Sequence, residues 1–170
     1  RAAGAPGLLK WPNDVLVQTA PDSAAAEYKK IAGVLLETAP GSPGTTLVLI
    51  GIGVNFAPDE SAAQAGGISL KETADRRIGY SEAALALIDH LIGEVSEFFA
   101  RFPAGPAGLA ARWQEASMMD GVTVSIVRNG IEKRGISRGI DPTGALLVDI
   151  EGSRITIVSG EVIVVDVASV

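Results

Sequence analysis

Three short segments of this chain place charged and amide side chains beside apolar runs. They are residues 10–14 (Lys-Trp-Pro-Asn-Asp), 30–37 (Lys-Ile-Ala-Gly-Val-Leu-Leu-Glu) and 51–56 (Gly-Ile-Gly-Val-Asn-Phe). A lysine sets a compact positive charge against a carboxylate or a phosphate, and an asparagine can both donate and accept hydrogen bonds. An aspartate can hold a magnesium-bound phosphate or accept a proton from an attacking amine. Together the segments indicate a site for an anionic ligand.

Each segment taken alone has a plainer interpretation. Residues 12–14 are typical of a hairpin turn closed by an Asx hydrogen bond, and Lys29 with Lys30 is typical of solvated loop charges. Gly51 and Gly53 match only part of a dinucleotide-binding fingerprint, because the third glycine is missing and no helix is expected to follow. The indication of function therefore depends on the three segments occurring together.

The bulk composition narrows the class of protein. The 170 residues are 47% hydrophobic, enough to bury a core, and the net charge of −6 argues against a general nucleic-acid binder. The chain has no cysteine, which excludes disulfides, thiolate nucleophiles and Cys-ligated zinc and is in keeping with a reducing cytoplasm. No apolar stretch approaches the ~20 residues that a membrane-spanning helix needs.

The elements that must position the three segments are strands first and helices later. Strands are predicted over residues 8–17, 31–37 and 45–54, and their tight spacing favours an antiparallel meander. The near-continuous apolar run of the second strand predicts burial on both of its faces. Helical spacing of apolar residues predicts helices over 81–102 and 106–117. After these helices, four or five short strands predict a small β-barrel.

In order, spacing and residue type, the three segments resemble the catalytic domain of bacterial biotin–protein ligases, also called biotin–[acetyl-CoA-carboxylase] ligases. The resemblance implies an α+β fold, in which a mixed or antiparallel sheet with helices is followed by a small SH3-like β-barrel. Residues 1–117 are then expected to be the C-terminal portion of the catalytic domain, and 118–170 the C-terminal domain. The family's biotin-binding loop lies upstream of the first segment, so the chain is expected to begin inside a catalytic domain.

The resemblance also implies an activity. An ATP-dependent, AMP-forming ligase of the cytoplasm activates biotin to biotinyl-5′-AMP and transfers the biotin to a lysine of a biotin carboxyl-carrier domain. The expected ligands are biotin and ATP with Mg²⁺. The carrier domain is the expected partner, a homodimer is left open, and neither a membrane nor a nucleic acid is expected as a partner of this chain. Two alternatives stay open, namely a lipoate- or octanoate-type acyl-protein ligase and an inactive carrier-binding module.

Roles for individual residues follow from the same resemblance. Lys30 is expected to bridge the biotin carboxylate and the α-phosphate, and Asp14 to assist magnesium or the incoming lysine, so these two are the expected catalytic residues. Lys10 is expected to support the phosphates. The other expected substrate- and ATP-binding residues are Asn13, Gly33, Leu35, Gly51, Val54 and Asn55. No dedicated metal site is expected. Some family members carry an aromatic residue near the adenine at the position of Gly67, so that stacking contact is expected to be lost or moved here.

Overall fold

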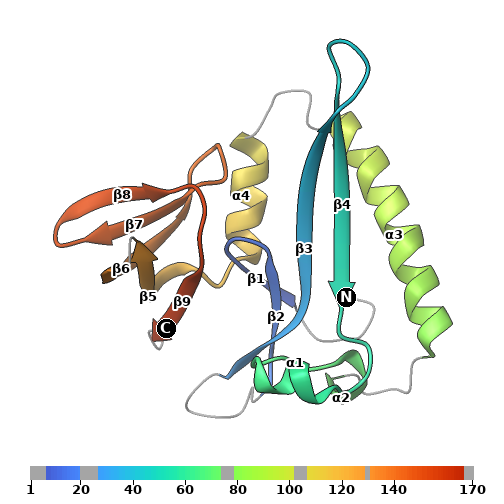
Figure 1. Cartoon of the computed structure of the whole chain (residues 1–170), viewed down its shortest axis with the longest axis horizontal. Coiled ribbons are helices and arrows are strands. Elements are labelled where there is room, and N and C mark those ends of the chain that lie inside the picture. Colours follow the sequence, from blue (N-terminus) through green and yellow to red (C-terminus); the bar gives the residue numbers. More distant parts are fainter. Residues whose placement is uncertain (1–6, 20–26, 74–78, 102–106, 129–130, 167–170) are drawn as a thin grey trace.

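A computed structural model describes residues 7–19, 27–73, 79–101, 107–128 and 131–166. In the first part of the chain, four strands form one sheet. They are β1 (Gly7–Lys10), β2 (Asp14–Gln18), β3 (Tyr28–Pro40) and β4 (Thr46–Val54). Each strand pairs antiparallel with the next in the order β1-β2-β3-β4, so the predicted meander is confirmed. Figure 1 shows β3 and β4 extending together well past the short strands β1 and β2.

The predicted burial of the second strand on both faces is wrong. Leu35 and Leu36 of β3 each keep 60% of their surface exposed. The reason is the unequal length of the strands, because the pairing of β2 with β3 stops at Gly33 while β4 accompanies β3 to Pro40. A continuous apolar run therefore does not by itself distinguish a covered strand from one whose faces are open.

Four helices lie within the described residues. They are α1 (Glu60–Gln64), α2 (Leu70–Thr73), α3 (Tyr80–Arg101) and α4 (Ala107–Ala116). The helices predicted over 81–102 and 106–117 correspond to α3 and α4. The apolar side chains of α3 remain largely in solvent, with Ile88 and Ile92 exposed by 51% and 63%. No described helix is long and apolar enough to cross a membrane.

Five short strands form a second sheet in the last part of the chain. They are β5 (Asp120–Arg128), β6 (Ile131–Ile140), β7 (Leu146–Ile150), β8 (Ser153–Ile157) and β9 (Val162–Asp166). The order is β8-β7-β6-β5-β9 and every pairing is antiparallel. The described pairings leave β8 and β9 as edges, so they define a sheet rather than a closed barrel. The mixed α+β class with antiparallel sheets agrees with the sequence prediction.

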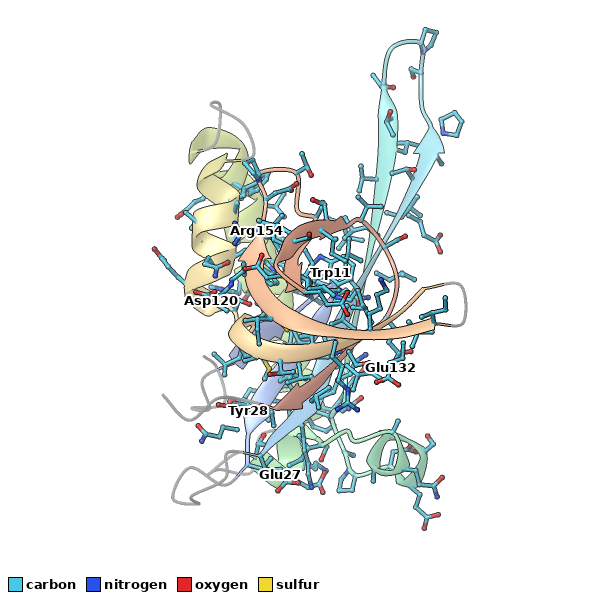
Figure 2. All side chains as sticks on the ribbon, turned by 90° about the vertical axis from the view of Figure 1, so that its left-hand side faces the viewer. Trp11, Glu27, Tyr28, Asp120, Glu132 and Arg154 are labelled. Carbon is cyan, nitrogen blue, oxygen red and sulfur yellow. The ribbon has the colours of Figure 1, made fainter. Side chains whose placement is uncertain are left out.

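The buried core lies mainly in this second sheet, and one residue of the turn between β1 and β2 belongs to it. Met119, Val124, Leu146 and Val148 are fully buried, and Trp11, only 5% exposed, packs into the same cluster. Figure 2 views the second sheet from outside and places Trp11 among its strands. Trp11 therefore joins the turn after β1 to the C-terminal half of the chain.

Backbone contacts strengthen this junction. The Met118 amide donates to the Leu9 carbonyl at 3.0 Å, and Leu9 forms a parallel bridge with Ser117. The indole Nε1 of Trp11 donates to the Gly144 carbonyl at 3.0 Å. Helix α4 contacts both β1 and β6, and it stands between the two sheets in Figure 1. The two sheets are thus connected by hydrogen bonds, by a shared core residue and by a helix.

Two arginines surround one carboxylate on the outer face of the second sheet. Arg154 donates from Nε to Asp149 Oδ1 at 2.8 Å, and Arg138 donates from Nε to Oδ2 at 2.9 Å. These two hydrogen bonds, of which the one from Arg154 has the larger effect, lower the pKa of Asp149 from 3.8 to about 2. The cluster links three neighbouring strands, since Arg138 lies on β6, Asp149 on β7 and Arg154 on β8.

We expect the substitution Asp149→Asn to destabilise the chain at neutral pH and to lose that effect in acid. The folded pKa lies below the unfolded value, so the stabilisation is fully present above about pH 4 and disappears as the pH falls toward the folded value of about 2. Denaturant titrations of both chains at pH 7 and at steps from pH 4 downward measure this. The gap between their free energies of unfolding should narrow throughout the acid steps, and a constant gap would contradict the role given to the arginines.

Candidate active site

The turn between β1 and β2 brings the first segment of interest together. Lys10 ends β1, Asp14 begins β2, and the two residues face each other in the antiparallel register. Trp11 points away from them into the core of the second sheet, while Pro12 and Asn13 stay exposed. The Trp11-Pro12 peptide bond is cis. The tryptophan therefore anchors a turn whose charged ends lie together at the ends of β1 and β2.

One carboxylate contacts both predicted lysines. Asp14 Oδ1 lies 2.5 Å from Lys30 Nζ, and Asp14 Oδ2 lies 3.3 Å from Lys10 Nζ. The side chains of Lys10 and Asp14 are less than one-fifth exposed, whereas that of Lys30 is 46% exposed. Lys29 turns to Glu27 instead, at 3.4 Å. The structure thus brings together Lys10, Asp14 and Lys30, with two positive charges against one negative charge, and this excess attracts an anion.

A glycine keeps space open beside the lysine. Gly33 lies opposite Asp14 across β2 and β3, and a Cβ atom there would be 3.4 Å from both Cε and Nζ of Lys30. A Cβ at this position would therefore touch the end of the Lys30 side chain in ordinary van der Waals contact, and a larger side chain would occupy the space beside the amine. Val54 lies close by on β4, opposite Ala32. Leu35 and Gly51, each a predicted site residue, face each other farther along β3 and β4, on the half of the hairpin that β2 does not reach.

The two predicted asparagines both bind the backbone of β3 or its neighbour. Asn13 Nδ2 donates to the Val34 carbonyl at 2.9 Å, and the Val34 amide donates back to the Asn13 carbonyl at 2.9 Å. Asn55 Nδ2 donates to the carbonyls of Lys30 and Ile68, each at 3.2 Å. Both carboxamides therefore hold the strand that carries Lys30. The sequence predicted both as ligand contacts, with an Asx hydrogen bond in the turn as the plainer interpretation of Asn13.

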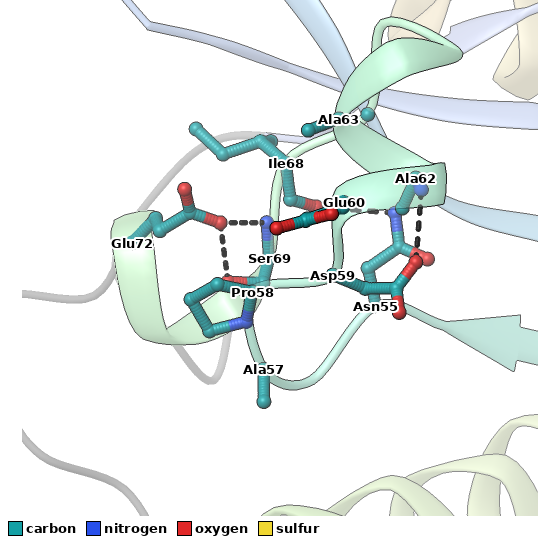
Figure 3. Close-up of a pocket in the computed structure, with 11 residues that line it drawn as sticks. Asn55, Ala57, Pro58, Asp59, Glu60, Ala62, Ala63, Ile68, Ser69 and Glu72 are labelled. Atoms are coloured by element: carbon teal, nitrogen blue, oxygen red, sulfur yellow. Dashed lines mark hydrogen bonds between the residues drawn. The ribbon is translucent and has the colours of Figure 1, made fainter.

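An open pocket lies next to Asn55, among α1, α2 and the residues between them (Figure 3). Asp59 accepts from the Ala62 amide at 3.0 Å, and its bond from the Ser61 hydroxyl is the main cause of its lowered pKa. On the other side Glu72 accepts from the amide and hydroxyl of Ser69, at 2.9 and 2.6 Å, and the hydroxyl bond lowers the pKa of Glu72. Asp59 thus accepts hydrogen bonds at the start of the short helix α1, and Glu72 accepts them at the start of the short helix α2.

The sequence analysis did not single out Ser69 and Glu72. Their pattern, a serine followed three residues later by a glutamate, is the signature of a capping box and could have located the start of α2. Ser69 is 2% exposed and forms part of the pocket wall. Among the residues that the structure describes, no three His, Cys, Asp or Glu side chains gather closely enough to hold a metal ion.

Gly67 is tightly enclosed. A Cβ atom on this residue would lie 2.7 Å from the Ala62 carbonyl oxygen and 3.1 Å from Asn55 Nδ2. A side chain there would require the local backbone or the Asn55 carboxamide to move. The local conformation therefore explains why this chain has glycine at position 67.

Comparison with known proteins places this site in context. Residues 121–165 match the family described as "Biotin protein ligase C terminal domain". The chain is 31% identical over 147 residues to the bifunctional ligase/repressor BirA of Escherichia coli K12, covering 85% of this chain and 42% of that protein. It is 32% identical over 158 residues to the biotin–[acetyl-CoA-carboxylase] ligase of Paracoccus denitrificans, covering 91% of this chain and 61% of that protein.

Solved structures of biotin protein ligases are similar to this chain in fold. The biotin protein ligase of Aquifex aeolicus in complex with biotin and ATP superposes with a TM-score of 0.68 at 24% identity, covering 95% of this chain and 62% of that one. Its apo structure superposes equally well, covering 96% and 67%. At this identity the match establishes the fold alone. The chain spans about two-fifths to three-fifths of the curated relatives described above.

Proposed function

We propose, since the chain is related to biotin–protein ligases over most of its length, that it forms part of an ATP-dependent, AMP-forming ligase. The enzyme activates biotin to biotinyl-5′-AMP and transfers the biotin to a lysine of a biotin carboxyl-carrier domain. The observation that carries the proposal is the cluster of Lys10, Asp14 and Lys30 beside the open position of Gly33. Such a cluster suits a reaction between two anions.

In the first step the biotin carboxylate attacks the α-phosphorus of ATP and pyrophosphate leaves. Two anions must approach each other, and negative charge spreads over the phosphoryl oxygens in the transition state. Lys30 would bridge the carboxylate and the α-phosphate, and Lys10 would support the phosphates. Asp14 contacts both amines in the structure, and before substrates bind it would hold them near the positions proposed for the reaction. The protein's contribution is to place charges in advance, which costs no reorganisation during reaction.

The remaining site residues receive supporting roles. Gly33, Leu35, Gly51 and Val54 would line the channel for biotin and the adenylate. Asn13 and Asn55 would contact the adenylate through their carboxamide oxygens, because their Nδ2 atoms donate hydrogen bonds within the protein.

Asp14 fits the magnesium that accompanies ATP, since Mg²⁺ is usually held by one or two carboxylates together with substrate phosphates. The metal would neutralise phosphate charge. Asp14 would also assist the incoming lysine of the carrier.

We divide the chain functionally near residue 118. Residues 1–117 would supply the C-terminal portion of the catalytic domain. Residues 118–170, which include the segment that matches the C-terminal domain of biotin protein ligases, would form a small SH3-like barrel that docks the carrier domain. The exposed faces of β3 and β4 offer a surface for a homodimer, and we include that in the proposal.

Biotin-dependent exchange of labelled pyrophosphate into ATP tests the proposed first step. The chain is assayed alone and supplemented with the N-terminal portion of the Paracoccus denitrificans relative, because the relatives are longer than this chain. We expect exchange that requires biotin. Exchange supported by lipoate or octanoate would favour the alternative acyl-protein ligase. No exchange with any of the three acids would favour a carrier-binding module and contradict the proposal.

A further inference from the structure

The direction of the Lys30 side chain depends on an irregularity in the sheet. From the turn, Asp14 pairs with Gly33 and Val15 with Ala32, but Leu16 pairs with Lys30, so Ile31 has no partner in β2. Side chains alternate between the faces of a strand, and regular pairing would put Lys30 on the face opposite Gly33. The extra residue is a β-bulge, a feature that redirects side chains beside functional sites. Here it brings Lys30 Nζ to within 3.4 Å of the Cβ position of Gly33.

The other edge of the bulge lies where β4 leaves β3. The last regular contact is the Asn55 amide, which donates to the Ile31 carbonyl at 2.8 Å. Beyond it, residues 66–68 continue alongside β3: the Lys30 amide donates to the Gly66 carbonyl at 3.2 Å, and the Ile68 amide donates to the Lys30 carbonyl at 2.8 Å. The bulge is therefore bordered by two separate segments, which one side chain connects.

The Asn55 side chain makes that connection. Its Nδ2 donates both to the Lys30 carbonyl on β3 and to the Ile68 carbonyl on the adjoining segment, each at 3.2 Å. The Asn55 backbone carbonyl accepts from the Leu70 amide at 2.8 Å. Neither an aspartate nor an apolar residue could donate these two hydrogen bonds.

We propose that Asn55 is a positioning residue, whose carboxamide maintains the bulge at Lys30 and Ile31 and so directs the Lys30 amine toward Asp14 and the open position of Gly33. Gly67 contributes to the same arrangement, because the absence of a side chain there leaves room for the Asn55 amide. The consequence for catalysis, that Asn55 directs the amine toward the two reacting anions, rests on the ligase function proposed above. The geometric part does not depend on it.

Zero-length cross-linking with a carbodiimide measures the direction of Lys30 without any ligand. The reagent joins a carboxylate to an amine in contact with it, so Asp14 can be captured by Lys30 or by Lys10, and peptide mass spectrometry gives the ratio of the two products. Lys10 faces Asp14 across the β1–β2 turn and not across the bulge, which makes it an internal reference. General loosening of the fold would reduce both products, whereas loss of the bulge reduces the Lys30 product alone.

We expect Asn55→Leu, Asn55→Asp and Gly67→Ala each to lower the ratio of the Lys30 to the Lys10 product by about threefold or more, the scale of an accessible ion pair. The matched control is Gly53→Ala, because a Cβ atom there meets nothing within 4 Å, and its ratio should equal that of the unmodified chain. If an Asn55 variant fails to fold, Gly67→Ala gives the answer with Asn55 in place. An unchanged ratio in the folded variants would overturn the proposal.

Kinetics extend the test to the reaction. In the pyrophosphate exchange assay Gly67→Ala, which keeps the Asn55 carboxamide as the proposed adenylate contact, should lower kcat and leave the KM for ATP within about twofold, as expected when positioning is lost and not a binding contact. A higher KM with unchanged kcat in Gly67→Ala would leave Asn55 as a nucleotide contact alone and contradict the positioning role. Absence of exchange in the unmodified chain would remove the ligase proposal while the cross-link ratio still decides the geometry.

Discussion

Replacing Lys30 by alanine is expected to reduce biotin-dependent pyrophosphate exchange by at least about 10²–10³-fold, the scale seen when one group that stabilises developing charge is removed. The reason is that Lys30 Nζ lies 2.5 Å from Asp14, at the point where β1, β2 and β3 bring two lysines to one carboxylate. The free energy of unfolding should change by no more than about 1 kcal/mol, because the side chain is 46% exposed and Asp14 keeps Lys10 as a partner.

The matched control is the neighbouring residue. Lys29→Ala removes the same charge one position away, but Lys29 pairs with Glu27 and not with Asp14. Exchange by this variant should equal that of the unmodified chain in the same supplemented assay. Normal exchange by Lys30→Ala, or equal losses in both variants, would contradict the specific role of Lys30. The lysine would then contribute only to the general surface charge.

The sequence was sufficient to locate the segments of the candidate site and to predict the type of the longer elements. The spacing of apolar residues predicted the meander and the two longer helices, because local periodicity depends only on which face an element buries. The relationship to biotin–protein ligases, first indicated by three short segments, is confirmed by relatives at 31% and 32% identity. Motifs of this kind are local, so they remain visible without any knowledge of tertiary contacts.

The features that could not be predicted depend on contacts between distant residues. The exposure of Leu35 and Leu36 follows from where β2 ends relative to β4, which no property of β3 encodes. The bulge at Ile31 and the double hydrogen bond of Asn55 join segments 13 to 25 residues apart. The contact of Trp11 with Gly144 spans 133 residues, and local periodicity gives no information about such a pair.

Truncating Trp11 is expected to produce the largest loss of stability in the chain. Trp11→Ala removes a 5%-exposed side chain from the cluster that contains Met119, Leu146 and Val148. We expect a decrease of about 3–5 kcal/mol in the free energy of unfolding, as for large-to-small changes in buried cores. Trp11→Phe keeps most of the apolar volume but loses the Nε1 hydrogen bond to Gly144. We expect a smaller decrease in the free energy of unfolding, made up of about 0.5–1.5 kcal/mol for that bond and the cost of any repacking. Urea denaturation followed by circular dichroism measures both.

The same substitution tests whether the second sheet supports the active site. Trp11 lies between Lys10 and Asn13 in sequence yet packs against β5 and β7, so its removal frees the turn that holds Lys10 opposite Asp14. We therefore expect Trp11→Ala to lower pyrophosphate exchange as well as stability, although the indole points away from the charged cluster. Val158→Ala, at a 79%-exposed apolar position, should change the free energy of unfolding by less than about 0.5 kcal/mol. If Trp11→Ala cost no more than this control, Trp11 would not belong to the core, and the second sheet would not be the support that fixes the catalytic turn.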